Sequence, residues 1–248
     1  IFKPGGGNVL KIMGGRAFRA PSIYEQVYND GGQSQVRSVD PARGLTLGPE
    51  SVYSGEIEYT RHFLEDWVAV AAAYTSFVEG IVITVPDSPG SELFRYTNGQ
   101  SPVLVVGGDL ELRREWRRGF MLSASYGYQH TRFLDETLKN PRLANAPEHL
   151  ASLRGVAPVV KELLSFGMRM SLEAPRRIGL DANTTTGTTV VADATVSGYV
   201  RDIGVRYVVG VYNLADRKYE VPVSDTFATR TLPQNGRTFL VDALWAWP

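Results

Sequence analysis

The feature that most constrains this chain is a two-residue alternation of apolar and polar side chains, which recurs along nearly its whole length. The clearest apolar row is Phe166, Met168, Met170 and Leu172. The residues between them are small, polar or charged, a spacing typical of a β-strand with one apolar and one polar face. The alternation returns over residues 120–128 and 239–247. Strands this numerous and this two-faced predict an all-β transmembrane antiparallel barrel.

Composition supports a barrel by exclusion. No apolar run approaches the roughly 18 to 20 residues of a membrane-spanning helix. A chain that enters a membrane without such helices must close a barrel, because hydrocarbon offers no partner for an unpaired backbone amide. The 248 residues carry 26 basic and 26 acidic side chains, so no basic field indicates a nucleic-acid partner. Cysteine is absent and the three histidines are far apart, so we predict no metal site and no cofactor.

The chain divides into strands whose connections alternate between short and long. After a partial strand over residues 1–4, ten strands are predicted near 9–16, 50–61, 67–79, 101–113, 119–133, 148–158, 162–174, 188–200, 203–213 and 235–247. The connections near 62–66, 114–118, 158–161 and 201–202 are tight, whereas those near 20–49, 80–100, 134–147, 175–187 and 214–234 are long and polar. Outer-membrane barrels have short periplasmic turns and long extracellular loops. If the first complete strand ascends from the periplasm, the tenth strand descends and returns the chain to the periplasm.

Aromatic residues gather near both ends of the predicted strands, as in the two aromatic girdles of a barrel. Those at the short-turn end are Trp67, Trp116, Phe120, Trp245 and Trp247. The arginines around Trp116 are Arg113, Arg114, Arg117 and Arg118. They resemble a binding patch, but snorkelling of long cationic side chains at a periplasmic turn is the interpretation we favour.

Five segments of the chain match known motifs, namely residues 15–25, 47–50, 145–150, 213–219 and 233–239. In this order they resemble motifs of the barrel of TonB-dependent outer-membrane receptors. The matching positions are Arg16, Phe18, Arg19, Pro21, Glu25, Pro49, Glu50, Asn213, Leu214, Asp216, Tyr219, Gly236 and Arg237. Prolines restrict the preceding residue to extended backbone and mark strand ends, and short polar side chains help to stop a strand.

The resemblance implies active uptake of a scarce solute, most often a ferric siderophore, at the bacterial outer membrane. Such receptors form barrels of about 22 strands with a plugged lumen. We therefore expect residues 1–248 to be a C-terminal portion of that barrel without its plug domain. The implied partners are the outer-membrane lipid bilayer, the siderophore, and the TonB energy-transducing protein, which acts through an N-terminal region that this sequence does not include.

The ligand chemistry is expected in the long loops and the upper lumen. Arginines and aromatic rings facing a cavity would supply charge and stacking to an anionic iron chelate. The candidates are Arg19, Tyr24, Tyr28, Arg37, Arg95, Tyr96, Arg132, Arg142, Arg176, Arg177 and Arg230. Arg16, Arg19 and Glu25 have a second interpretation, as buried lumen pairs that hold the base of the first loop.

Two other classes of function stay open on the sequence alone. A passive porin or a small self-contained barrel would share the alternation, although not the motifs. An outer-membrane barrel enzyme would need a nucleophile and a base facing the lumen, and the inward positions of the clearest strands offer no obvious pair. We therefore predict no catalytic residues.

Overall fold

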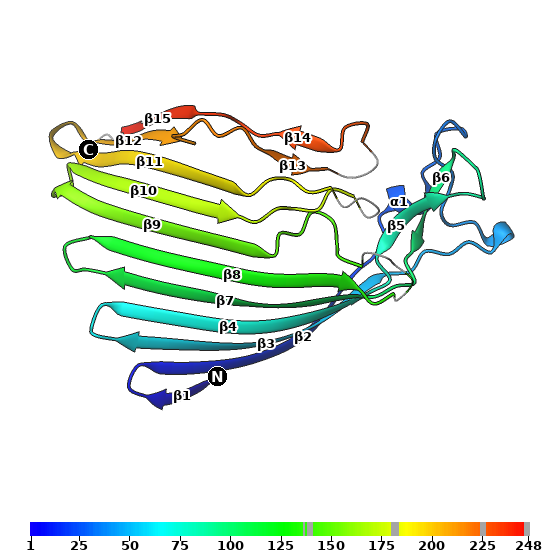
Figure 1. Cartoon of the computed structure of the whole chain (residues 1–248), viewed down its shortest axis with the longest axis horizontal. Helices are drawn as coiled ribbons and strands as arrows, with labels where there is room; N and C mark the ends of the chain where they lie inside the picture. The colour runs from blue at the N-terminus through cyan, green and yellow to red at the C-terminus, as the bar shows by residue number, and fades with distance from the viewer. Residues whose placement is uncertain (136, 138–140, 180–183, 224–226, 246–248) are drawn as a thin grey trace.

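The chain forms one large antiparallel sheet, curved like part of a barrel wall (Figure 1). The computed structural model describes residues 1–135, 137, 141–179, 184–223 and 227–245. Eleven strands pair in the order β1-β2-β3-β4-β7-β8-β9-β10-β11-β12-β15, and two small hairpins, β5-β6 and β13-β14, lie outside this sheet. Within the described residues the edge strands β1 and β15 do not pair with each other, so the barrel is not closed.

The bounds of the strands agree closely with the alternation. The strands of the large sheet are β1 (Phe2–Gly5), β2 (Asn8–Arg19), β3 (Glu50–Phe63), β4 (Trp67–Glu79), β7 (Val103–Glu115), β8 (Met121–Phe133), β9 (His149–Val160), β10 (Leu164–Glu173), β11 (Thr189–Val200), β12 (Val205–Tyr212) and β15 (Thr238–Trp245). The predicted partial strand and ten complete strands are confirmed. Trp247, expected in the last strand, lies outside the described residues.

The long connections contain short elements that the alternation did not predict. They are β5 (Val82–Pro86), β6 (Phe94–Asn98), β13 (Glu220–Pro222), β14 (Thr231–Pro233), the helix α1 (Ile23–Val27) and the 3-10 helix Pro41–Arg43. A second 3-10 helix, Arg201–Ile203, forms the tight turn between β11 and β12. None of the helices among the described residues has the length and apolar character needed to cross a membrane.

The strand register aligns the alternation into two continuous faces. Met168 of β10 lies opposite Gly155 of β9 and Ala194 of β11, and all three are apolar. One residue further, Arg169 lies opposite Arg154 and Asp193. We call the face that carries Met168 the outward face and the face that carries Arg169 the inward face. The outward face suits lipid, and the inward face suits a wet lumen.

Charged side chains of the inward face are paired across neighbouring strands. Lys11 of β2 contacts Glu58 of β3 at 2.6 Å, and Arg169 contacts Asp193 at 2.5 Å. Glu58, Asp109 and Glu173 also border an inward hollow of about 620 Å³. Carboxylates that would be costly against lipid therefore face the lumen, as the alternation predicted.

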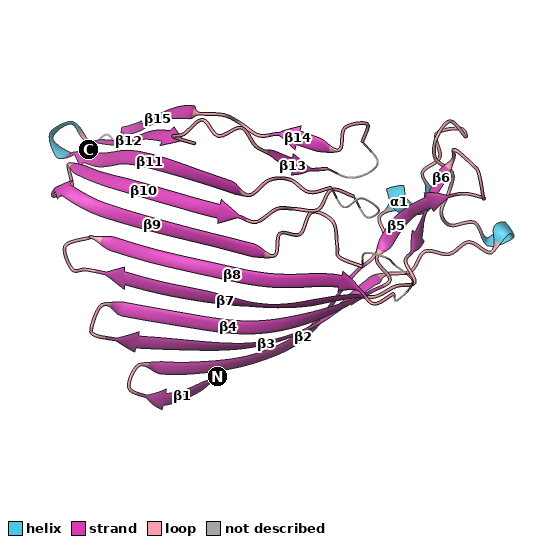
Figure 2. Cartoon of the chain, viewed as in Figure 1, coloured by secondary structure: helices cyan, strands magenta, loops and turns pink. Residues whose placement is uncertain are grey.

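The two ends of the sheet differ, as Figure 2 shows. Short turns join the strands at one end, whereas α1 and the hairpin β5-β6 gather at the other. At the short-turn end, Arg114 lies over the rings of Trp67 and Trp116, at 5.2 and 4.4 Å from their centroids. Arg113 does not snorkel into the lipid interface as we interpreted it. Its register places it opposite inward Ser123, and it pairs with Glu115 at 3.1 Å.

Candidate functional site

The two motifs that flank the first long loop meet in one cluster of hydrogen-bonded side chains, Arg19, Glu25 and Glu50, which we call the clasp. Arg19, the last residue of β2, donates from Nε to Glu50 at 2.6 Å and from Nη1 to Glu25 at 3.0 Å. Glu50 opens β3 and also accepts the backbone N–H of Val82, where β5 begins, at 2.7 Å. The clasp therefore joins β2, α1, β3 and β5, so that residues distant in sequence fix the base of the loop.

Glu25 also caps the helix that carries the first aromatic candidates. The Ser22 hydroxyl accepts the N–H of Glu25, and the Glu25 carboxylate accepts the N–H of Ser22, which together form a capping box. The hydrogen bonds from Arg19 hold the pKa of Glu25 down at about 2, with a smaller contribution from the bonds to Ser22. Glu25 is therefore ionised throughout the neutral range and orients α1 above β2.

Arg16 does not join this clasp, so the interpretation of Arg16 as part of a buried pair at the loop base is wrong. Arg16 lies opposite Tyr53 in the β2-β3 register, and its guanidinium sits 5.1 Å from the centroid of that ring. Because Arg16 and Arg19 are three residues apart in a strand, they lie on opposite faces. Arg16 is on the outward face at the long-loop end. Arg19 and Glu25 do pair at the loop base, but the Arg19 side chain is 49% exposed rather than buried.

Three of the tyrosine candidates form one aromatic cluster. Tyr24 stacks on Tyr28 with 4.5 Å between ring centroids, and it meets Tyr96 edge-on at 6.4 Å. Phe94 packs edge-on against Tyr96 at 6.3 Å. Tyr24 and Tyr28 are 51% and 42% exposed, so their rings are available to a ligand. Burial, and to a lesser extent nearby Tyr24 and Glu25, raises the pKa of Tyr96, which therefore stays neutral.

Buried polar side chains hold this cluster in place. Gln35 is 1% exposed, and its Oε1 accepts the hydroxyl of Tyr24 at 3.1 Å. Ser38 is fully buried, and its Oγ accepts the backbone N–H of Tyr96 at 2.8 Å. Asn98 links three segments, because its side chain bonds the backbone of Gly48 and of Gly80. A buried polar group is costly unless it is bonded, so these contacts make the loop arrangement specific.

A second group of arginine candidates lies at the long-loop end of β8 and in the loops that follow β8 and β10. The backbones of Arg132 and Arg142 form an isolated antiparallel bridge, and the side chain of Arg142 contacts Glu148 at 3.2 Å. Arg177 is 7% exposed and donates to the carbonyl oxygen of Arg142 at 2.8 Å. Arg142, Glu148 and Arg177 border a small cavity of about 130 Å³. Arg176 forms an ion pair with Glu173 and donates to Asn145 at 2.9 Å.

The contacts sort ten of the eleven loop candidates by how exposed and how engaged their side chains are. Arg19, Arg95, Arg142 and Arg176 are engaged with carboxylates, with Arg95 at 3.7 Å from Asp87. Arg37 and Arg132 are exposed, and no ion pair of either is found in the part of the chain that the structure describes. Arg37 stands between Gln35 and Ser38, which hold Tyr24 and Tyr96. Tyr24, Tyr28 and Arg37 are thus among the exposed candidates that, within the described residues, are not engaged with a carboxylate.

The two C-terminal motifs have a structural use. Asn213, with φ of 54°, ends β12 and is 4% exposed. Its Oδ1 accepts the N–H of Arg217 at 2.8 Å, and its Nδ2 donates to the carbonyl of Asn235 at 3.3 Å. Asp216 accepts the N–H of Arg237 at 2.8 Å, which lowers the pKa of its carboxyl group. These residues fasten the return of the chain from β12 to β15.

Several residues of the loop apparatus were missed by the sequence analysis. They are Gln35, Ser38, Asp87, Phe94 and Asn98. Their partners are distant in sequence, so no local spacing indicated them; only the aromatic pair of Phe94 and Tyr96, two residues apart, hinted at a strand face. Within the described ranges, no group of three or more histidine or acidic side chains is arranged to hold a metal ion.

A family model matches most of the large sheet. The model described as "TonB dependent receptor-like, beta-barrel" matches residues 11–214. The matched region extends from β2 to the end of β12 and includes both loop clusters. No curated protein sequence matches the chain significantly.

Solved structures share this fold at low sequence identity. The ferric-catecholate import receptor Fiu from K12 E. coli has a TM-score of 0.71 and 18% identity, over 98% of this chain and 33% of its own. The siderophore receptor PiuA from Acinetobacter baumannii has a TM-score of 0.73 and 18% identity, over 98% and 34%. The copper transporter OprC has a TM-score of 0.72 and 18% identity, over 97% and 38%. The chain therefore spans about a third of the length of these structures.

Proposed function

Because the chain belongs to the TonB-dependent receptor-like β-barrel family, we propose that it forms part of a receptor importing a ferric siderophore. Barrels of this family lie in the bacterial outer membrane, and the family is one of receptors and transporters rather than enzymes. Proteins similar in fold include a ferric-catecholate import receptor and a siderophore receptor. A ferric siderophore is the proposed solute of this chain as well.

The observation that carries the proposal is the stacked, half-exposed Tyr24–Tyr28 pair, and Arg37 is an exposed arginine of the same long loop. Two stacked, half-exposed rings offer a planar surface to an organic chelator, and an exposed guanidinium offers charge to an anionic one. The rings are fixed by Gln35, and the base of the loop is fixed by the Arg19 clasp. A preorganised surface loses little conformational entropy when a ligand binds.

The proposed domain organisation follows from the size of the sheet. Receptor barrels of this type have about 22 strands and a plugged lumen. The chain supplies eleven sheet strands, and we assign them to the C-terminal portion of such a barrel. The order of the motifs from Arg19 to Arg237 supports this placement. Energy from the TonB protein would then act through a plug domain that lies outside residues 1–248.

Binding of the solute is tested with the full-length receptor in detergent. We expect Tyr24→Ala with Tyr28→Ala, and Arg37→Gln separately, to weaken binding of one ferric chelate about tenfold or more, since each removes a direct contact. A ferric catecholate and a ferric hydroxamate are titrated by quenching of intrinsic fluorescence. Arg117→Gln, an exposed arginine at the opposite end of the sheet, is the matched control. Unchanged affinity for every chelate in the loop variants would overturn the assignment of this surface.

Active uptake is distinguished from a passive porin by its dependence on energy. Cells that produce the full-length receptor are given the iron-55 form of the chelate, with and without a protonophore and with and without TonB. We expect saturable uptake that falls to background when the proton gradient is dissipated or when TonB is absent. Uptake that stays linear in concentration and unaffected by both treatments would establish a passive pore and refute the active mechanism.

A further inference from the structure

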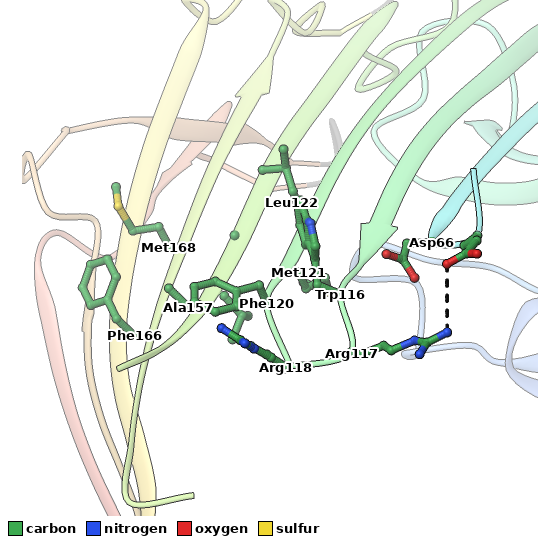
Figure 3. A pocket seen from close by; sticks show the side chains of 13 residues that line it. Asp66, Trp116, Arg117, Arg118, Phe120, Met121, Leu122, Ala157, Phe166 and Met168 are labelled. Atoms are coloured by element: carbon green, nitrogen blue, oxygen red, sulfur yellow. Dashed lines mark ion pairs between the residues drawn. The ribbon is translucent and has the colours of Figure 1, made fainter. Parts of the chain in front are cut away.

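The outward face carries an apolar groove at the short-turn end, far from the proposed solute site. It has a volume of about 890 Å³ and lies beside the turn between β7 and β8. In Figure 3, Phe120 and Leu122 border it on one side and Phe166 and Met168 on the other. These four side chains are between 38% and 49% exposed. The groove therefore opens toward the membrane rather than toward the lumen.

The groove exists because small residues of β9 lie between larger ones. Gly155 lies opposite Leu122 of β8 and Met168 of β10, and Ala157 lies opposite Phe166. A row without long side chains between two rows that have them leaves a furrow along the strand. A Cβ built on Gly155 would meet nothing closer than the Met121 carbonyl oxygen at 3.9 Å, so a side chain at this position would enter the furrow.

Charges of both signs stand at the short-turn end of this groove. Arg118 lies next to Phe120 and Ala157, while Arg117 lies toward Asp66 (Figure 3). The Arg117 Nη2 and Glu65 Oε2 atoms are 4.0 Å apart, and the two side chains are 89% and 85% exposed, so the ion pair between them is weak. Among the described residues, neither Arg118 nor Asp66 has a side-chain ion pair. A cation and a carboxylate are thus both available at the headgroup level.

We propose that this groove is a specific site for one phosphatidylethanolamine molecule of the periplasmic leaflet. An acyl chain would lie over Gly155 and Ala157, the phosphate would bind Arg118 and Arg117, and the ammonium group would bind Asp66 and Glu65. A purely anionic phospholipid would leave the carboxylates facing its phosphate. A choline headgroup has no N–H to donate to them. The pairing of both charges with an apolar furrow therefore selects a zwitterionic lipid with a primary ammonium group.

Lipid selectivity is measured on the full-length receptor by native mass spectrometry after incubation with equimolar phosphatidylethanolamine, phosphatidylglycerol and phosphatidylcholine. We expect one retained phosphatidylethanolamine per receptor, about tenfold over either competitor, which is the size expected for one charge-assisted hydrogen bond. Retention of phosphatidylglycerol in preference, equal retention of phosphatidylcholine, or no retained lipid would each overturn the proposal.

Filling the groove separates a built site from general lipid contact. Gly155→Leu should abolish the retained lipid. Gly14→Leu is the matched control, because Gly14 is also on the outward face, and a Cβ there has its nearest atom, the Ser54 carbonyl oxygen, at 3.8 Å. The control should retain lipid as the wild type does. If both variants retain lipid equally, the lipid is annular and the groove is not a site.

Charge variants test the recognition of the headgroup. Arg118→Gln should reduce retention of all three phospholipids about tenfold, and Glu65→Gln with Asp66→Asn should remove the preference for phosphatidylethanolamine over phosphatidylglycerol. Arg201→Gln, at the turn between β11 and β12, is the control for loss of a periplasmic arginine. Binding of the ferric chelate should be unchanged in all of them, since the groove lies at the opposite end from Tyr24. Headgroup selectivity that survives both charge variants would refute the assignment.

Discussion

Two regions of this molecule are held together by different kinds of contact. The wall is the large sheet with its short turns, and the cap is the long loops at the other end, with α1 and the hairpin β5-β6. In the wall, each of the 13 residues of β7 has a partner in β8 without a break in register. In the cap, side chains bond distant backbone, as Asn98 does with Gly48, which is 50 residues away. The wall is specified by a repeated pattern, whereas the cap depends on a few individual residues. The two regions should therefore respond differently to substitution.

The largest expected effect comes from a charge placed on the outward face of the wall. Met168→Lys should destabilise the inserted barrel by about 2–4 kcal/mol, because it puts an ammonium group into hydrocarbon near the middle of β10. Ser171→Lys, on the inward face of the same strand, should be mild. The measurement is reversible urea unfolding of the full-length receptor in lipid vesicles. Equal losses at both positions would contradict the assignment of the two faces.

A smaller effect is expected where the wall meets the cap. Asp193 is 4% exposed, binds Arg169 at 2.5 Å and accepts the N–H of Asn213 at 2.9 Å. Asp193→Ala removes both contacts and should cost about 1–3 kcal/mol, while Arg169 stays partly solvated and limits the loss. The same unfolding measurement applies, with Ser197→Ala on the inward face of β11 as control. A loss no greater than that of the control would show that the junction does not depend on this carboxylate.

The same contrast decides what the sequence could predict. The two-residue period and the position of each short turn follow from local pattern, so the eleven strands and their order were accessible. The helix α1 and the hairpin β5-β6 were not, because they are held by contacts such as Glu50 to Val82 that join distant residues. Residue type selected arginines and tyrosines of the loops, but only the structure separates exposed Arg37 from Arg19, which is occupied by two carboxylates.

One error of the sequence analysis had a local cause that was visible from the start. Arg16 and Arg19 were grouped by their shared motif, although an odd separation in a strand places side chains on opposite faces. The structure puts Arg16 over Tyr53 and Arg19 in the clasp. Inside a strand, an odd or even separation of two residues therefore predicts their faces better than a shared motif does. Beyond the end of the strand, the motif is the better guide to which residues meet.

A third prediction concerns the cap and its dependence on pH. The pKa of Glu25 is held at about 2, below its unfolded value of about 4.3, so its contribution is present above pH 4.3 and lost as the pH falls toward 2. Glu25→Gln should loosen α1 by about 1 kcal/mol at neutral pH and remove this pH dependence. The measurement is the mobility of a spin label at Val27→Cys in the full-length receptor with any cysteine outside residues 1–248 replaced by serine, because residues 1–248 contain none.

The matched control for this prediction is Glu92→Gln, an exposed carboxylate of the neighbouring loop. It should leave the mobility of α1 and its pH profile unchanged. If the label is equally mobile in the wild type and in Glu25→Gln between pH 7 and pH 3, the clasp does not order the helix. The contrast between wall and cap would then rest on the backbone of the loop rather than on its side chains.

The smallest effect is expected at the short turns, which belong to the wall. Arg201 and Glu162 form an ion pair between neighbouring turns, but their side chains are 74% and 46% exposed. The turn itself is closed by the backbone, because Gly204, with φ of 65°, donates its N–H to the Arg201 carbonyl at 3.2 Å. Arg201→Gln should therefore change stability by less than about 0.5 kcal/mol, whereas Gly204→Ala should cost about 1 kcal/mol. A reversed order in urea unfolding would mean that side chains, not backbone geometry, close the wall at this end.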